Sequence, residues 1–435
     1  MKLTLVHIAL TLRTDGAVAA PETTDQNTAP TDPEADRNRL PAARDGHGRL
    51  HTPGTSLAGL LRAHLGEHST ALLGPPPDTK SLTTSPLRIL GTTTTPPTID
   101  GTTAGTIWRG QTAVDRRRAA PAVTTLRTAE LLPAGTTIDL YLRLDHPDAH
   151  WPALAEHLTT WQPQIGRGHT TGRGHTDTTT IRYGTLDLDQ PDDLHTWLTR
   201  GGPDLVRHVA TTDLTVTPEP NATITVDFHV HGELHVGTGD KPAGTTPALR
   251  DGHRRPIIPG TTWKGILRAR ATWILAHLGI TTCATDHQCG TCPTCRLFGY
   301  TAPPSKTGAT GRRGHVTFAD SPLRQPGNTR PARPVPHTHV AIDRVTGGAH
   351  DGLLYTLETF PAAHTTLTIG CPKPLEPWMR ALLLLALRDL HDGYLGVGAN
   401  TTRGYGTLRA TDPKALTPTT DQLAALAALT PTGQP

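Results

Sequence analysis

Residues 250–270 read RDGHRRPIIPGTTWKGILRAR, and residues 44–65 read RDGHGRLHTPGTSLAGLLRAHL. The two stretches align without a gap, with Gly260 on Gly54 and Arg268 on Arg62. In each, a short run with Pro or apolar residues leads into Pro-Gly, then Thr or Ser, and then an amphipathic pattern. This order predicts a strand end, a tight turn and a helix start. Because the preceding RDGH is repeated as well, a duplicated module explains the pair better than two unrelated junctions.

The two predicted helix starts are candidate anion-binding sites. A helix start exposes backbone N–H groups at the positive end of the helix dipole, and the hydroxyl residues after each Gly are available as N-caps. The simpler interpretation is that Pro-Gly-Thr only caps a strand-to-helix junction. The residues that this motif contributes to a predicted phosphate site are Gly54, Thr55, Ser56, Arg62, Gly260, Thr261, Thr262, Lys264 and Arg268.

The composition limits both the fold and the partners. A chain of 435 residues is too long for one small core and suggests two domains. Aromatic residues make up only 4%, so the core is expected to consist of Leu, Ile, Val and Ala with few rings. The formal net charge is only +3, so a polyanion would have to meet a local basic face or oriented amides. The N-terminus MKLTLVHIALTL is strand-like and lacks the apolar core of a signal peptide, which predicts a cytoplasmic protein.

Motifs of the first half recur in the second half in the same order. RDGH…PGT is followed by an Asp-Arg pair (Asp115-Arg116 and Asp343-Arg344) and then by a Gly-rich loop after a helix. The elements read strand–helix–strand–strand–helix–strand in each half, with one helix expected around 194–209. This order predicts an α+β protein of two tandem ferredoxin-like modules. The predicted boundaries are 1–212 for the first module, 221–412 for the second and 413–435 for a C-terminal tail.

Two Gly-rich loops can present backbone N–H groups to phosphates. They read GRGHTTGRGH from Gly166 and GVGANTTRGYG from Gly396, and neither has the context of a Walker or Rossmann motif. The alternative is that each loop is only a tight turn between strands. The candidate phosphate-binding residues of these loops are Gly166, Arg167, Gly168, Arg173, Arg403 and Gly404.

Four of the five cysteines fall within one short insertion of the second half. They are Cys283, Cys289, Cys292 and Cys295, in the pattern Cys-x5-Cys-x2-Cys-x2-Cys. Four soft ligands at this spacing can surround one tetrahedral Zn²⁺, and a site closed by four protein ligands is structural. The alternatives are four unliganded thiols, or a site in which His287 replaces one Cys.

The chain resembles the RAMP superfamily, the repeat-associated backbone subunits of type III CRISPR effector complexes. The second half carries PIIPGTTWKGILRARA, CRLFG, GHVTFADSPL, HVAIDRVTGGAHDGLLYTLETFPA and LGVGANTTRGYG, and the first carries TPGTSLAGLLRAHL, TAVDRRRAA and IGRGHTTGRGH. The resemblance covers most of the chain, although the central section of the first half is degenerate. It implies two fused modules, each an RRM-like fold that holds CRISPR RNA. It also implies β-hairpins that insert between bases, with Asp-Arg segments such as that of Arg344 supporting them.

The resemblance bears on catalysis as well. In family members that cut target RNA, an Asp in the loop before the strand leading to PG[ST] serves metal-dependent cleavage. The second half has Thr245 at that position, so the second module is expected to be inactive. In the first half Asp36 lies slightly upstream of the matching position, and we hypothesise that it acts with Mg²⁺. The alternative is that Asp36 is a solvated loop carboxylate.

The sequence therefore predicts a backbone subunit that binds CRISPR RNA in antiviral defence. Its expected partners are CRISPR RNA, target RNA and other effector subunits, including a large signalling subunit, and no membrane. One alternative is a metal-independent ribonuclease that processes CRISPR RNA with His51 or His169 as general acid or base. A second is a scaffold that contacts only protein and has no salt-dependent affinity for RNA. The low aromatic content favours gripping of the RNA backbone over base stacking.

Overall fold

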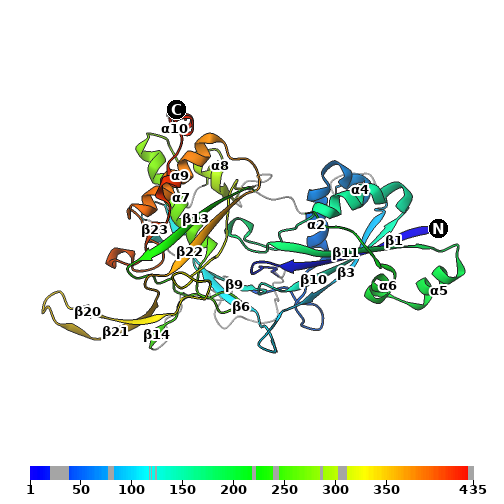
Figure 1. Ribbon diagram of the computed structural model, residues 1–435, viewed down its shortest axis with the longest axis horizontal. Coiled ribbons are helices and arrows are strands. Elements are labelled where there is room, and N and C mark those ends of the chain that lie inside the picture. Colours follow the sequence, from blue (N-terminus) through cyan, green and yellow to red (C-terminus); the bar gives the residue numbers. More distant parts are fainter. Residues whose placement is uncertain are drawn as a thin grey trace, which may run out of the picture. The chain divides into compact units, whose positions relative to one another are not determined.

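Figure 1 shows a computed structural model of the protein, which describes residues 1–19, 39–76, 83–116, 118, 120–122, 125–217, 222–238, 244–284, 288–301 and 311–429. The chain forms two compact units. Unit 1 comprises Met1–Trp108, Ala129–His169 and Arg173–Pro220, and unit 2 comprises Arg109–Thr128, Thr170–Gly172 and Asn221–Pro435. Helices and antiparallel sheets occur in both units, which confirms the prediction of an α+β protein.

Unit 1 is built on a sheet with the strand order β12-β11-β1-β10-β3. Its central strand β1 (Lys2–Leu12) pairs antiparallel with β10 (Thr137–Asp145) and with β11 (Thr176–Asp187). Strand β3 (Leu87–Thr95) pairs with β10, and the short β12 (Thr212–Asp213) pairs with β11. Helix α2 (Gly54–Leu65) follows β1 in the chain, and α4 (Pro147–Thr160) follows β10.

Both faces of the unit 1 sheet are covered. On one face Val6, Ile8 and Leu10 of β1 pack in a core with α2 and α4, and on the other Leu3 and Leu5 pack in a second core with the last helix of the unit. Alternate residues of a strand point to opposite faces, so β1 has buried apolar residues on both faces.

The single helix expected around 194–209 is wrong. The chain forms α5 (Pro191–Thr199) and α6 (Gly202–Val209) instead. The break falls at Gly201-Gly202-Pro203, where Gly202 has φ 55° and Pro203 provides no backbone N–H for a continuing helix.

Unit 2 has a second sheet with the order β18-β22-β13-β23. Its members are β13 (Ala222–His231), β18 (Thr317–Phe318), β22 (His364–Cys371) and β23 (Thr407–Ala410). Counted along the chain, these strands lie in the order second, third, first, fourth. The strands β3, β10, β1 and β11 of unit 1 have that same order. Helix α7 (Gly260–His277) lies between the first and second strands, and α9 (Pro377–His391) lies between the third and fourth.

The core of unit 2 includes Phe228 of β13, Trp263 of α7 and Leu382 of α9. The opposite side chains of β13, such as those of Thr223 and Thr225, are exposed. Residues 413–429 also belong to this core. There η4 (Pro413–Leu416) and α10 (Thr420–Ala427) bury Leu416 and Leu426.

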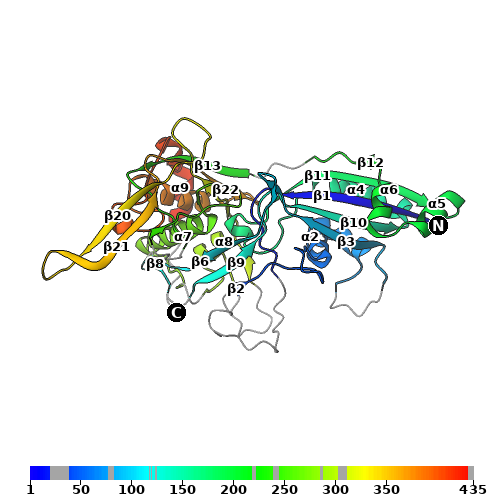
Figure 2. The same ribbon diagram turned by 90° about the horizontal axis from the view of Figure 1, so that it is seen from below.

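A long hairpin projects from unit 2 (Figure 2). It consists of β20 (Val335–Ile342) and β21 (Ala349–Thr359), and β14 (Thr245–Thr246) adds to β21 in parallel. Its outer part carries exposed apolar side chains. Val345 is 94% exposed and Leu354 is 70% exposed, so the hairpin presents apolar surface without a covering element among the described residues.

The remaining elements are short. In chain order they are β2 (Arg39–Leu40), η1 (Gly66–His68), α3 (Ser69–Leu73), β4 (Thr98–Ile99), β5 (Thr102–Thr103), β6 (Ile107–Gln111), β7 (Val114–Asp115), β8 (Ala120–Pro121), β9 (Arg127–Leu131), η2 (His169–Thr171), β15 (Ile257–Ile258), α8 (Pro293–Phe298), β16 (Gly299–Tyr300), β17 (Arg312–Arg313), β19 (Ser321–Pro322) and η3 (Thr401–Arg403). Of these, β7 and β8 form a small hairpin that comes from the first half of the chain and belongs to unit 2.

Candidate functional site

The repeated RDGH stretch forms the same turn in both units. The Asp45 carboxylate accepts hydrogen bonds from the backbone N–H of His47 and of Arg49, both at 2.9 Å, and from Arg49 Nε at 2.8 Å. Asp251 makes the corresponding bonds at 3.0, 2.8 and 2.7 Å. The backbone bond from Arg49 is the largest factor that lowers the pKa of Asp45 to about 2. The role that Asp45 and Asp251 share is therefore to hold the turn.

A glutamate that the sequence did not single out completes each turn. Arg44 Nη2 donates to Glu130 at 2.6 Å, and Arg250 Nη2 donates to Glu358 at 3.0 Å. Each carboxylate also accepts a backbone N–H from the residue two positions before the Arg, at 2.8 and 2.9 Å. These glutamates lie 86 and 108 positions from their partners, so no local pattern announces them.

The helix starts differ from expectation in their caps. Helices α2 and α7 begin at Gly54 and Gly260, their N-caps are Pro53 and Pro259, and no side chain caps either helix. The prediction of Thr or Ser N-caps is wrong because the Pro-Gly step places those residues inside the first turn. Thr55, Ser56, Thr261 and Thr262 lie there.

A carboxylate of the protein already bonds the first amide of α7. Asp320 Oδ1 accepts the N–H of Gly260 at 2.8 Å, and Asp320 Oδ2 accepts from Arg109 Nη1 at 2.6 Å. A Cβ at Gly260 would lie 2.0 Å from the Phe318 carbonyl oxygen and 2.5 Å from that of Thr171, so only Gly fits. The cationic side chains of Lys264 and Arg268 lie one and two turns further along α7, and both are partly exposed.

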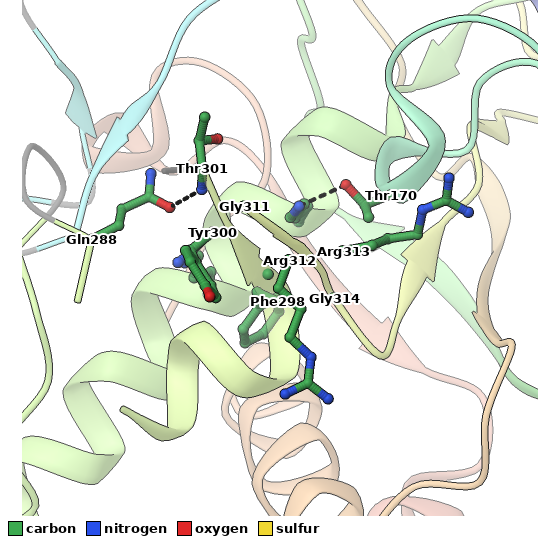
Figure 3. Close-up of a pocket in the computed structure, with 12 residues that line it drawn as sticks. Thr170, Gln288, Phe298, Tyr300, Thr301, Gly311, Arg312, Arg313 and Gly314 are labelled. Atoms are coloured by element: carbon green, nitrogen blue, oxygen red, sulfur yellow. Dashed lines mark hydrogen bonds between the residues drawn. The ribbon is translucent and has the colours of Figure 1, made fainter. Parts of the chain in front are cut away.

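Those side chains line a cleft of about 450 Å³ in unit 2, which we call the basic cleft. Its cationic members are Lys264, Arg268, Arg312 and Arg313, and no acidic residue lines it among the described residues. Figure 3 shows Thr170 on one side of the cleft and Gln288, Tyr300 and Thr301 on the other. Lys264 Nζ donates to Thr170 Oγ1 at 2.7 Å.

Burial and mutual repulsion disfavour the charged forms of the cations in the cleft. Desolvation, followed by the charges of Arg268 and Arg116, lowers the pKa of Lys264 to about 7. Burial also lowers the pKa of Arg268, whose Nε has no hydrogen-bond partner in the described part of the chain. Uncompensated buried cations favour an anionic ligand, since an anion would satisfy both the charges and the free N–H.

The four clustered cysteines come together next to Arg268 of α7, as their spacing predicts. Their Sγ atoms all lie within 4.8 Å of one another, and Cys283 Sγ lies 3.4 Å from Cys295 Sγ and 3.6 Å from Cys292 Sγ. A tetrahedral Zn²⁺ with Zn–S bonds of about 2.3 Å requires S···S separations of about 3.8 Å. The backbone N–H of Cys292 donates to Cys289 Sγ at 3.3 Å. These four residues can hold a metal ion such as zinc.

Two arginines complete the surroundings of the cysteine cluster. Arg116 Nη1 donates to the Cys283 carbonyl oxygen at 3.0 Å and to Cys283 Sγ at 3.1 Å. Arg268 Nη2 lies 3.8 Å from Cys295 Sγ. Hydrogen bonds with Cys295 lower the pKa of Cys292, so this pair retains a thiolate. Arginines beside thiolates offset the negative charge that four sulfur ligands place around a divalent ion.

The two Asp-Arg pairs start turns of similar build. The Asp115 carboxylate accepts the backbone N–H of Arg118 at 3.0 Å, and that of Asp343 accepts those of Val345 and Thr346 at 2.9 and 2.8 Å. Arg344 is exposed at the end of the long hairpin. Within each pair the Asp carboxylate holds the turn through hydrogen bonds to backbone N–H groups, so the Arg side chain is not needed for the turn.

The Gly-rich loops are held by close backbone packing. Gly166 and Gly398 have φ of 83° and 87°, and a Cβ on either would lie 2.3 Å from a carbonyl oxygen, that of Ala17 or of His235. The tight-turn interpretation therefore explains these glycines. The Arg167 N–H donates to Ala17, and the Arg173 N–H donates to Gly168. In the second loop, Arg403 and Gly404 are exposed.

The equivalent arginines of the two helices have different surroundings. Arg62 donates to the carbonyl oxygens of Leu73 and Gly74 at 2.7 and 2.9 Å and so ends α3, whereas Arg268 lines the basic cleft. Gly54, Thr55 and His51 line a cleft of about 390 Å³ in unit 1 that is otherwise mostly apolar. Among the described residues, cationic side chains therefore line a cleft at the helix start of unit 2, and not at that of unit 1.

The hypothesis of metal-dependent cleavage falls on residues that lie outside the described ones. Asp36 is among them, and so is His287, the alternative zinc ligand. Thr245 is exposed in β14 and pairs with Thr356 of β21. The role of Asp36 with Mg²⁺ stays a prediction.

Residues 227–409 match the family model of the RAMP superfamily. The match spans about two fifths of the chain and lies within unit 2, so this unit is similar to RAMP proteins. It includes α7, the four cysteines, the long hairpin and the second Gly-rich loop. No curated protein sequence matches the chain. Within the described ranges, no helix is both long and apolar enough to cross a membrane.

Proposed function

We propose that this protein is a backbone subunit of a type III CRISPR effector complex, in which unit 2 holds CRISPR RNA phosphates in the basic cleft. The observation that carries the proposal is the set of four cations around a cleft without an acidic lining residue. Phosphate contacts position RNA without reading its sequence, as a guide-holding subunit requires. The RAMP match over 227–409 supports this assignment.

The architecture supports two RAMP modules in tandem. In a ferredoxin-like fold the four strands of the βαββαβ unit lie in the order four, one, three, two. The main strands of both units follow this order. The two RDGH turns with their Arg–Glu pairs support the same duplication. The proposed boundaries are close to 1–212 and 221–412, except that the β7–β8 hairpin, which comes from the first stretch, belongs to unit 2.

The long hairpin supports contact with RNA bases. Its exposed apolar side chains, including Val345 and Leu354, suit insertion between bases, and Arg344 lies at its end. We assign no cleavage to unit 2, because Thr245 has no carboxylate to hold Mg²⁺. In this proposal target RNA pairs with the held guide, and the large signalling subunit and small subunits assemble beside it.

The proposal is tested by RNA binding of the full chain at several salt concentrations. We expect Lys264→Ala and Arg268→Gln to weaken binding of single-stranded RNA, and Lys264→Ala to reduce the slope of log affinity against log salt by about 0.7. Lys414→Ala is the matched control, since this exposed Lys lies on η4, outside the cleft. Equal affinity in all variants, or no salt dependence in the wild type, would favour the protein-only scaffold.

A further inference from the structure

A cluster of rings at the base of the long hairpin has no role in the proposed phosphate site. His337 and His339 lie on one face of β20 because they are two positions apart, and His339 pairs with Tyr355 across the hairpin. The His339 and Tyr355 rings are stacked, with centroids 5.2 Å apart at 23°. The His337 ring lies 5.0 Å from His339. We call these three residues the ring ladder.

One buried tyrosine fixes the two imidazoles. Tyr405 is 5% exposed, and its Oη lies 2.7 Å from His339 Nε2 and 2.8 Å from His337 Nδ1. A tyrosine hydroxyl has one hydrogen, so it donates to one imidazole and accepts from the other. Both rings are thereby held in a defined orientation. This ordering has already removed rotamer freedom that a ligand would otherwise have to restrict.

Charge around the ring ladder favours an anionic aromatic ligand. Arg403, from the second Gly-rich loop, donates to the Tyr355 hydroxyl and is itself exposed. Burial, with smaller effects of His337 and Arg403, lowers the pKa of His339, which favours the neutral form of this ring. Burial, followed by the charge of Glu233, raises the pKa of Tyr405. Stacked rings beside one cation suit a base and its phosphate.

We propose that the ring ladder binds one unpaired nucleobase of single-stranded RNA, which stacks on the exposed His337 ring while the adjoining phosphate contacts Arg403. The inference rests on the proposed function, since it names a nucleotide of the same RNA. Base stacking on aromatic side chains is a common source of sequence-tolerant affinity. Because the His337 ring is exposed, one more planar ring can stack on it. A nucleobase has such a planar face.

The test combines cross-linking with binding by the full chain. Single-stranded RNA with 5-iodouridine at successive positions is irradiated with the protein, because this base cross-links to rings that stack on it. We expect one cross-linked peptide to contain His337 or His339. The double variant His337→Ala/His339→Ala should bind RNA roughly tenfold more weakly. His337→Phe should retain binding, and His195→Ala, which replaces an exposed His on α5 outside the hairpin, should leave it unchanged.

The outcomes separate this inference from the proposed function. Weaker binding by Lys264→Ala, with the double Ala variant unchanged and no cross-link at the ladder, overturns the ladder alone. Absence of RNA binding by the folded wild type overturns both. A loss in His337→Phe equal to that in the double Ala variant shows a need for imidazole and overturns stacking. The melting temperature of each variant should lie within a few degrees of that of the wild type. A loss of RNA binding then does not result from misfolding.

Discussion

Arg116 donates a hydrogen bond of 3.1 Å to the sulfur of Cys283, although 167 positions separate the two residues in the chain. The same guanidinium nitrogen reaches the Cys283 carbonyl oxygen at 3.0 Å. A residue of the first half thus contacts a candidate zinc ligand of the second half, within unit 2. Outer contacts of this kind orient metal ligands and tune the affinity of the site.

Replacing Arg116 should weaken metal binding without removing a ligand. For Arg116→Met we expect roughly a 10- to 100-fold loss of zinc affinity, the range seen when outer-shell partners are removed. Competition with a chromophoric chelator on the full chain measures it. Arg118→Met is the control, because Arg118 is exposed on the same small hairpin. Equal zinc affinity of the two variants would contradict a role for Arg116.

Binding of RNA should depend on pH through Lys264. Its pKa is about 7 in the free protein, and a bound phosphate raises it, so RNA binding takes up a proton above pH 7. We therefore expect RNA affinity to fall as the pH rises from 7 to 9. Lys264→Arg, which stays charged, should bind RNA with little change over this range. A wild-type affinity that is flat from pH 7 to 9 would place the phosphate elsewhere.

The pair of Arg109 and Asp320 should stabilise unit 2. Arg109 is 1% exposed, and Asp320 joins it to the first amide of α7. Asp320→Ala leaves a buried cation and an unbonded N–H, so we expect a loss of about 3–5 kcal/mol in the free energy of unfolding. Denaturant titration measures it. Asp392→Ala breaks only the exposed pair with Arg388, and its effect should stay below about 1 kcal/mol.

A side chain at Gly398 should disrupt the second Gly-rich loop. The φ of 87° and a Cβ position 2.3 Å from the His235 carbonyl oxygen both exclude other residues. We expect Gly398→Ala to cost about 2–4 kcal/mol of stability. In Gly46→Ala the new Cβ meets nothing within 4 Å. A similar melting temperature for the two variants would show that the loop can move aside.

Local patterns in the sequence predicted the parts that depend on near neighbours. The Cys spacing predicted the cluster, since the four ligands lie within one insertion, and the repeated RDGH predicted two turns of the same build. Asp320 and Arg116 were not predicted as partners, because Asp320 bonds Gly260 of α7 across 60 positions and Arg116 bonds Cys283 across 167, and only the folded chain brings them together. The caps of α2 and α7 were predicted wrongly, because Pro-Gly starts each helix one residue before the hydroxyl side chains.

The return of Arg109–Thr128 to unit 2 has a consequence for how this chain can be divided. Cutting between 211 and 220 gives a second half that contains every cysteine and all of the RAMP match, yet lacks the guanidinium beside Cys283 and the partner of Asp320. Such a fragment would lack the β7–β8 hairpin that packs along α7. The two halves of the sequence are therefore not separate folding units, and an engineered split would have to keep the small hairpin with the second half.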